Sequence, residues 1–105
     1  MRLWAIKSNL YQQYVDKAYG LSDLSSFTML FNKKESALRE IRGGAPYYYD
    51  RPIAVTKVTL NALASEQGCH PWDLDVPESL MRSTANELDL EIVPINLSES
   101  KAKRG

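Results

Sequence analysis

The sequence predicts an α+β fold: a single compact domain in which a mostly antiparallel sheet of about four strands packs against two to three helices. Of the 105 residues, 44% are hydrophobic and 25% are charged, as in ordinary globular domains. Strand-like and helix-like segments alternate along the chain. No apolar run approaches the roughly 18 residues that a membrane span requires. We expect residues 1–97 to form the domain and residues 98–105 a frayed polar and basic tail.

The first strand is predicted at residues 2–8. Trp4 and Ile6 fall on one face of this strand, and Leu3 and Ala5 fall on the other. Apolar side chains on both faces are typical of a strand that is covered on both sides. We therefore expect this strand to be central in the sheet.

Residues 8–20 are predicted to form a short amphipathic helix. Their apolar side chains recur at every fourth position, and Gly20 provides a stop signal. The alternative is a pair of tyrosine-rich strand segments around Gln12 and Gln13, and the sequence leaves it open.

A strand at residues 27–31 and a helix directly after it form the next predicted unit. The strand is rich in aromatic and large apolar residues. A capping box follows, in which Asn32 accepts from the amide of Glu35 and the Glu35 carboxylate reaches back. The helix is expected to end at the Gly43-Gly44 pair, where glycine adopts a left-handed conformation at little cost.

Residues 53–60 are predicted to form a third strand because they are the most β-branched stretch of the chain. The connection from the strand at 27–31 is long enough for a parallel crossover, although antiparallel pairing remains open. One or two helical turns are expected at residues 61–67, ending at Gly68.

The last predicted helix and strand follow a second capping pattern. Asp75 provides an acidic cap, Pro77 lies in the first turn and Glu78 follows it. Apolar residues continue at helical spacing to Leu88. Alternating apolar residues then predict a final strand, in which Pro94 indicates an edge position with a bulge or bend.

Charge is unevenly distributed, although 13 bases and 13 acids cancel overall. Residues 1–61 carry a balance of +4, residues 62–99 a balance of −7, and the last residues add three bases. Such asymmetry steers association with oppositely charged partners. The alternative is that the two halves neutralise each other within the fold. The acidic surface that we expect to meet a basic partner protein comprises Asp73, Asp75, Glu78, Glu87, Asp89 and Glu91.

A run of three tyrosines precedes Arg51. Tyr47, Tyr48 and Tyr49 would point to alternating sides of an extended segment, so that at least one is expected in the core and the others on a contact surface. Exposed tyrosines are favoured at protein interfaces and also serve as stacking platforms for bases. A nucleic-acid site built on this segment would comprise Arg39, Arg42, Tyr48 and Arg51.

Most catalytic chemistry is missing from the sequence. Cys69, the single cysteine, directly precedes His70, the single histidine, so their side chains are expected to diverge and not to form a nucleophile–base pair. No glycine-rich phosphate loop is present. A metal site would use His70, Asp73 and Asp75, with Glu78 as a fourth donor, but their spacing matches no recognised ligand pattern. We expect no cofactor and no enzymatic activity.

Three segments carry a resemblance in layout: MRLWAI at residues 1–6, FTMLFNKKESAL at residues 27–38 and IAVTKV at residues 53–58. In this layout the chain resembles small accessory proteins of phages and other mobile elements, among them anti-CRISPR and related anti-defence inhibitors. The resemblance implies a cytoplasmic, non-enzymatic binder that blocks a host nucleic-acid-processing complex, with acidic groups where nucleic acid would bind.

The leading hypothesis is therefore a protein-binding inhibitor or adaptor, present as a monomer or homodimer, without a membrane partner. The first alternative is a small RNA- or DNA-binding module, and the second is a small metal-dependent enzyme. Trp4 is expected in the core and Trp72 at its edge.

Overall fold

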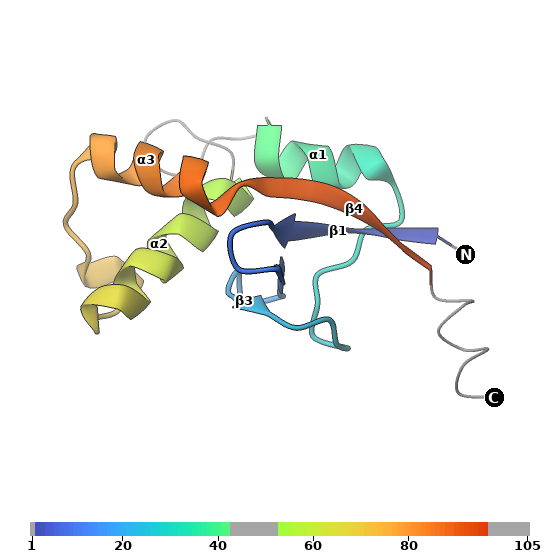
Figure 1. The fold of residues 1–105 in the computed structure, drawn as a ribbon, viewed down its shortest axis with the longest axis horizontal. Helices are drawn as coiled ribbons and strands as arrows, with labels where there is room; N and C mark the ends of the chain where they lie inside the picture. The colour runs from blue at the N-terminus through green and yellow to red at the C-terminus, as the bar shows by residue number, and fades with distance from the viewer. Residues whose placement is uncertain (1, 43–52, 97–105) are drawn as a thin grey trace.

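The computed structural model describes residues 2–42 and 53–96 (Figure 1). Within these residues it contains an antiparallel sheet and three α-helices, which confirms the predicted α+β class. The strands are β1 (Arg2–Ser8), β2 (Gln13–Val15), β3 (Leu21–Ser22) and β4 (Leu90–Asn96). The helices are α1 (Lys34–Arg42), α2 (Ile53–Gln67) and α3 (Glu78–Leu88), with a short 3-10 helix η1 (Pro71–Asp73) before α3.

The sheet has the strand order β3-β2-β1-β4, so β1 is interior and β4 is an edge strand, as predicted. β1 and β4 pair along their whole length, from Arg2 opposite Asn96 to Ser8 opposite Leu90. This register has no interruption, which excludes the bulge from the predicted bulge or bend at Pro94. Pro94 lies directly opposite Trp4 within the strand.

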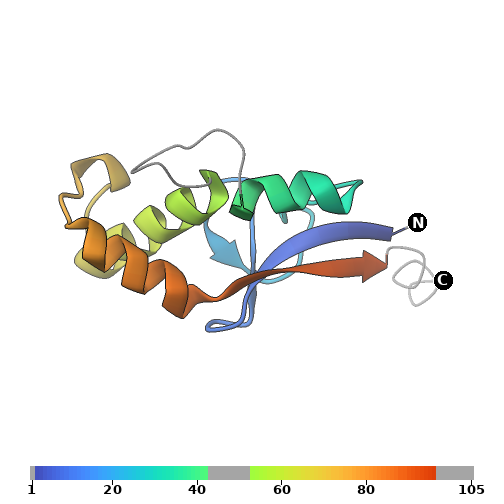
Figure 2. The same cartoon turned by 90° about the horizontal axis from the view of Figure 1, so that it is seen from above.

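Two hydrophobic cores hold the elements together, and α2 belongs to both. α1 lies along the β1–β4 pair, whereas α2 and α3 extend beyond one end of these strands (Figures 1 and 2). The first core joins the sheet to the helices through Ile6, Val15, Ala54, Val58 and Leu88. The second core joins α2 to α3 and the segment before it through Leu60, Leu63, Leu74, Val76 and Met81.

The strand predicted at residues 53–60 is wrong, because this segment is the first half of α2. Ala54 and Val58 face the sheet, while Thr56, Thr59 and Leu60 are also buried. A helix covered on several sides loses the amphipathic period by which helices are recognised, and its β-branched residues then resemble a buried strand. The Thr59 hydroxyl donates to the Val55 carbonyl at 2.6 Å, which satisfies a buried polar group inside the helix.

The helix predicted at residues 8–20 is also wrong, and the alternative of two strand segments is closer to the structure. β1 turns at residues 9–12 into β2, and Gln12 and Tyr19 have left-handed φ values of 55° and 60°, which a helix cannot contain. The side chain of Asp16 organises the following loop. Its Oδ1 accepts from the amides of Ala18 and Gly20, both at 2.9 Å, and its Oδ2 accepts from the Ser22 hydroxyl at 3.1 Å.

Residues 27–31 do not form the predicted strand, but they touch the sheet at two points. Thr28 forms an isolated bridge with Asp16, and Phe31 forms one with Trp4. The predicted helix after Asn32 is confirmed as α1. Its expected stop at Gly43 and Gly44 lies outside the described residues, as does the tail at residues 98–105.

The predicted helix after Asp75 is confirmed as α3, but its cap differs from the prediction. The N-cap residue is Pro77, and no side-chain bond caps the helix. The helical turns predicted at residues 61–67 are the second half of α2, and Gly68 follows it with a φ of 71°, as the predicted stop requires. Trp4 is half-buried instead of fully buried.

Tyr19 connects the β2–β3 loop to two helices. Its hydroxyl donates to Glu40 Oε1 of α1 at 3.1 Å, and the Lys57 ammonium of α2 lies 4.8 Å from its ring centroid. Burial of the phenol raises the pKa of Tyr19 above its ordinary value of 10.0, and the charge of Glu40 and the hydrogen bond to it act in the same direction.

This raised pKa predicts an alkaline dependence of stability. Because the fold favours the neutral phenol, its contribution is fully present below about pH 10 and is lost as the pH rises through the raised pKa. We expect the free energy of unfolding to fall less steeply above about pH 10 in Tyr19→Phe than in the native chain. Urea unfolding at neutral and alkaline pH checks this. Equal alkaline slopes for the two chains would show that Tyr19 titrates normally.

Candidate functional site

The six residues of the predicted acidic surface are all exposed, but they lie in separate places. Asp73, Asp75 and Glu78 surround the start of α3, Glu87 lies in its last turn, and Asp89 and Glu91 lie where β4 begins. At 1.5 Å per residue, the two ends of α3 are about 15 Å apart. The carboxylates therefore follow the length of α3 instead of forming one compact patch.

Most of these carboxylates are not neutralised by the first half of the chain. Glu78 forms an ion pair with Arg82 of the same helix at 3.4 Å, and Asp89 accepts a hydrogen bond from the Asn9 side chain at 3.1 Å. Among the described residues, Asp73, Asp75, Glu87 and Glu91 have no ion-pair partner. The molecule thus presents unpaired negative charge along α3 and at the start of β4.

An apolar hollow adjoins this acidic side of the molecule. Its walls come from the β1–β2 turn, the second half of α2 and the outward face of α3, and it encloses about 250 Å³. Leu10 and Tyr11 remain 52% and 55% exposed there, and Leu80 remains 37% exposed. We call this hollow the hairpin groove and define it by Leu10, Tyr11, Leu63, Glu66, Leu80 and Glu87.

The charged residues at the hairpin groove are all acidic. Among the described residues that line it, Glu66 of α2 and Glu87 of α3 are the charged ones, and both are exposed. Tyr11 also lines a second hollow of about 460 Å³, which follows α2 past Ala62 and Asn61. Apolar contact surface and negative charge are therefore combined in one place.

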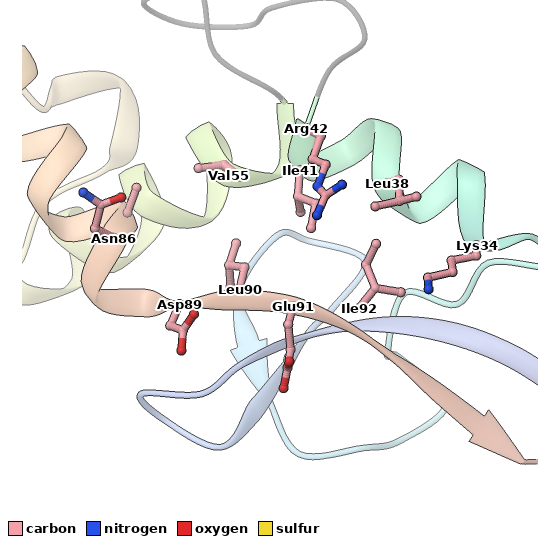
Figure 3. A pocket seen from close by; sticks show the side chains of 11 residues that line it. Lys34, Leu38, Ile41, Arg42, Val55, Asn86, Asp89, Leu90, Glu91 and Ile92 are labelled. Atoms are coloured by element: carbon pink, nitrogen blue, oxygen red, sulfur yellow. The ribbon is translucent and has the colours of Figure 1, made fainter.

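A larger cavity, of about 550 Å³, lies between α1 and β4 (Figure 3). We call it the β4 cavity. Its apolar lining includes Leu38 and Ile41 of α1 and Leu90 and Ile92 of β4. Figure 3 shows that Leu90 and Ile92 point from β4 toward α1, whereas Glu91 points to the other side of the strand. Asp89 and Glu91 of the predicted acidic surface border this cavity together with Lys34 and Arg42.

The predicted metal-site alternative is not supported by the geometry. Across residues 2–42 and 53–96, no three His, Cys, Asp or Glu side chains are placed to hold a metal ion. His70 instead stacks on Trp72, with ring centroids 4.5 Å apart and planes at 5°. The expectation that Trp72 lies at the core edge is wrong, because the side chain is 78% exposed.

The aromatic and basic segment predicted as a second contact surface, with Tyr47, Tyr48, Tyr49 and Arg51, lies outside the described residues. Arg39 and Arg42, the remaining members of the nucleic-acid alternative, belong to α1, where both are exposed. That alternative therefore stays a prediction.

In comparisons with known proteins, no family model, curated protein or solved structure matches the chain. In the part of the chain that the structure describes, no helix is both long and apolar enough to cross a membrane.

Five residues of the hairpin groove are not among the predicted site residues, and they differ in the signals they carry: Leu10, Tyr11, Leu63, Glu66 and Leu80. Leu10 and Tyr11 fall in the segment predicted as a helix, whereas a hairpin would place them at an exposed tip. Leu80 and Met81 are neighbours about 100° apart on a helix, so one can point into the core while the other lies at the edge of the apolar stripe. Met81 is buried, so Leu80 shares the outward face with Glu87. Glu66 carries no signal beyond its charge.

Proposed function

We propose that this chain is a non-enzymatic protein-binding inhibitor or adaptor whose hairpin groove accepts a partner segment that is both apolar and basic. The observation that carries the proposal is the combination, in one hollow, of exposed Leu10, Tyr11 and Leu80 with Glu66 and Glu87. Apolar area supplies affinity, and the carboxylates select the charge of the partner.

The apolar part of the hairpin groove favours a protein partner. Tyr11 presents a large ring with few rotatable bonds, which is the kind of side chain that dominates interface energetics. Burying an exposed leucine or tyrosine is worth about 1 kcal/mol or more at about 25 cal/mol per Å². An amphipathic helix with apolar residues at three- and four-residue spacing suits a groove between a hairpin tip and two helices.

The carboxylates of the hairpin groove favour lysine and arginine on the partner segment. Glu66 and Glu87 have no ion-pair partner among the described residues, so a cation can approach each of them without breaking an existing pair. Asp73 and Asp75 near one end of α3 extend the negative field beyond the groove. Such a field raises the association rate with a basic partner, and added salt weakens it.

Proteins of nucleic-acid-processing complexes carry basic surfaces of this kind, and we propose that such a protein is the partner. Occupying its basic surface with the acidic side of this chain would compete with nucleic acid for the same site. The layout resemblance to anti-defence inhibitors adds no support, because residues 27–31 and 53–58, which carry it, do not form the expected strands.

Peptide display tests the proposal even though the partner is unidentified. We expect the full chain, used as bait, to enrich peptides that combine Lys or Arg with Leu, Phe or Trp at helical spacing. Charge reversal by Glu66→Lys with Glu87→Lys should lower the affinity for the enriched peptides at least about tenfold, because two attractive contacts become repulsive.

Asp23→Lys with Glu35→Lys is the matched control, since it changes the net charge equally at exposed residues outside the groove. The control should bind within about twofold of the native chain. If no peptide class is enriched, or if the groove reversal and the control weaken binding equally, the proposal is wrong. Retention of single-stranded RNA at low salt, lost on Arg39→Glu with Arg42→Glu, would favour the nucleic-acid alternative instead.

A further inference from the structure

The outer edge of β4 has unpaired backbone groups at known positions. Trp4 exchanges two hydrogen bonds with Phe31, at 2.9 and 2.8 Å, and on the other side of β1 the Asn9 amide donates to the Asp89 carbonyl at 3.1 Å. Because backbone groups alternate sides along a strand, the odd-numbered residues of β1 bond toward β4.

The unbroken register then shows whether the backbone amide and carbonyl of each β4 residue point toward β1 or toward the outer edge of the sheet. Glu91 is opposite Lys7 and Val93 is opposite Ala5, so their amides and carbonyls point inward to β1. Leu90 and Ile92 alternate with them and direct their amides and carbonyls outward. Pro94 occupies the next outward position, where the missing N–H costs no bond within the sheet.

The same residues that face outward with their backbone also line the β4 cavity with their side chains. Leu90 and Ile92 point toward Leu38 and Ile41 of α1 (Figure 3). In a sheet, directly paired residues place their side chains on the same face. A strand that pairs with Leu90 and Ile92 would therefore place its alternate side chains in the cavity of about 550 Å³.

Charge distinguishes the two sides of this edge. Lys34 and Arg42 border the cavity from α1, and Arg42 forms no ion pair with a described residue. Glu91 projects from the opposite side of β4 (Figure 3). Asp89 also borders the cavity, so the positive charge of the cavity is confined to the α1 wall, where it favours an occupant with a carboxylate beside its apolar side chains. On the other side of β4, Lys7 of β1 lies directly opposite Glu91.

We propose that the outer edge of β4 accepts an extended segment of a partner protein, which adds as a further strand to the sheet. The segment is apolar at alternate positions, carries an Asp or Glu toward Arg42, and inserts its apolar side chains in the β4 cavity. It differs in conformation and in charge from the helical, basic segment proposed for the hairpin groove. A second copy of this chain is disfavoured, because Pro94 removes one donor from each edge of a β4–β4 pair.

A second display selection with the full chain tests this surface. The expected class of peptides alternates apolar residues and includes a carboxylate. With a peptide from this class, amide hydrogen exchange should slow at Leu90 and Ile92, whose amides have no hydrogen-bond acceptor within the described residues. Arg42→Glu should weaken binding of this peptide about tenfold. Glu66→Lys with Glu87→Lys should leave the affinity for this peptide unchanged.

Changing the number of outward donors gives an independent readout. Ile92→Pro removes an outward N–H and should lower the affinity for the same peptide. Pro94→Thr adds an outward N–H and should raise this affinity. If Ile92→Pro fails to fold, Pro94→Thr still decides. No enriched peptide that protects Leu90 and Ile92, equal affinity for Pro94→Thr and the native chain, or self-association of the native chain through β4 would overturn the proposal.

Discussion

Asp16→Ala is expected to lower the free energy of unfolding by about 2 kcal/mol, because it leaves three partly buried donors without their acceptor. The Asp16 side chain is buried and accepts the amides of Ala18 and Gly20 and the hydroxyl of Ser22. No other described side chain offers these three donors an acceptor. Urea unfolding of the native chain and the variant at neutral pH measures the difference.

Two further variants test whether the stability loss comes from the hydrogen bonds that the Asp16 carboxylate accepts. Asp16→Asn keeps one acceptor oxygen for the two amides and should cost only about 1 kcal/mol. Asp23→Ala removes an exposed carboxylate from the next loop and should change stability by less than about 0.5 kcal/mol. Similar losses for Asp16→Ala and Asp23→Ala would show that Asp16 does not hold the loop.

Met81→Ala is the second substitution with a large expected effect, a loss of about 3 kcal/mol. Met81 is almost completely buried in the core between α2 and α3, and truncation there loses transfer free energy and leaves a cavity. This core lies apart from the one under the sheet, so the loss should fall most heavily on α3. Hydrogen exchange of the amides of α3, compared with those of β1, measures this local destabilisation.

Leu80→Ala is the matched control on the adjacent residue. Leu80 is partly exposed in the hairpin groove, so its truncation should cost less than about 1 kcal/mol of stability. Leu80→Ala should nevertheless lower the affinity for peptides selected on the hairpin groove, because the substitution removes apolar contact area. Equal stability losses for the two variants would contradict the assignment of Met81 to the core and Leu80 to the surface.

The parts of the fold that the sequence predicts are those with a local signal. β1, α1, α3 and β4 each have a clear alternation, a helical period or a capping pattern. The four elements are confirmed, although the predicted side-chain cap of α3 is not. The sequence places the first half of α2 in the wrong class because this helix is buried on several sides, and burial erases the helical period. The loop that contains Asp16 is missed because its conformation depends on side-chain bonds to backbone amides and on a left-handed residue at Tyr19.

The candidate site is predicted only in part, for a related reason. Its negative charge is visible in the sequence, and Glu87 belongs to both the predicted surface and the hairpin groove. Leu10 and Tyr11 come from a hairpin tip far from α3 in sequence, and their position depends on the tertiary fold. No local pattern predicts that they meet Leu80.

The hairpin groove is proposed to bind an apolar and basic segment. The most direct test is an NMR titration of the isotope-labelled full chain with a peptide enriched by that groove. We predict that the amide signals of Leu10, Tyr11 and Leu80 shift together on binding, and that the shifts disappear in the variant with Glu66→Lys and Glu87→Lys. Shifts confined to α1 and β4, or shifts that persist in this variant, would contradict the claim.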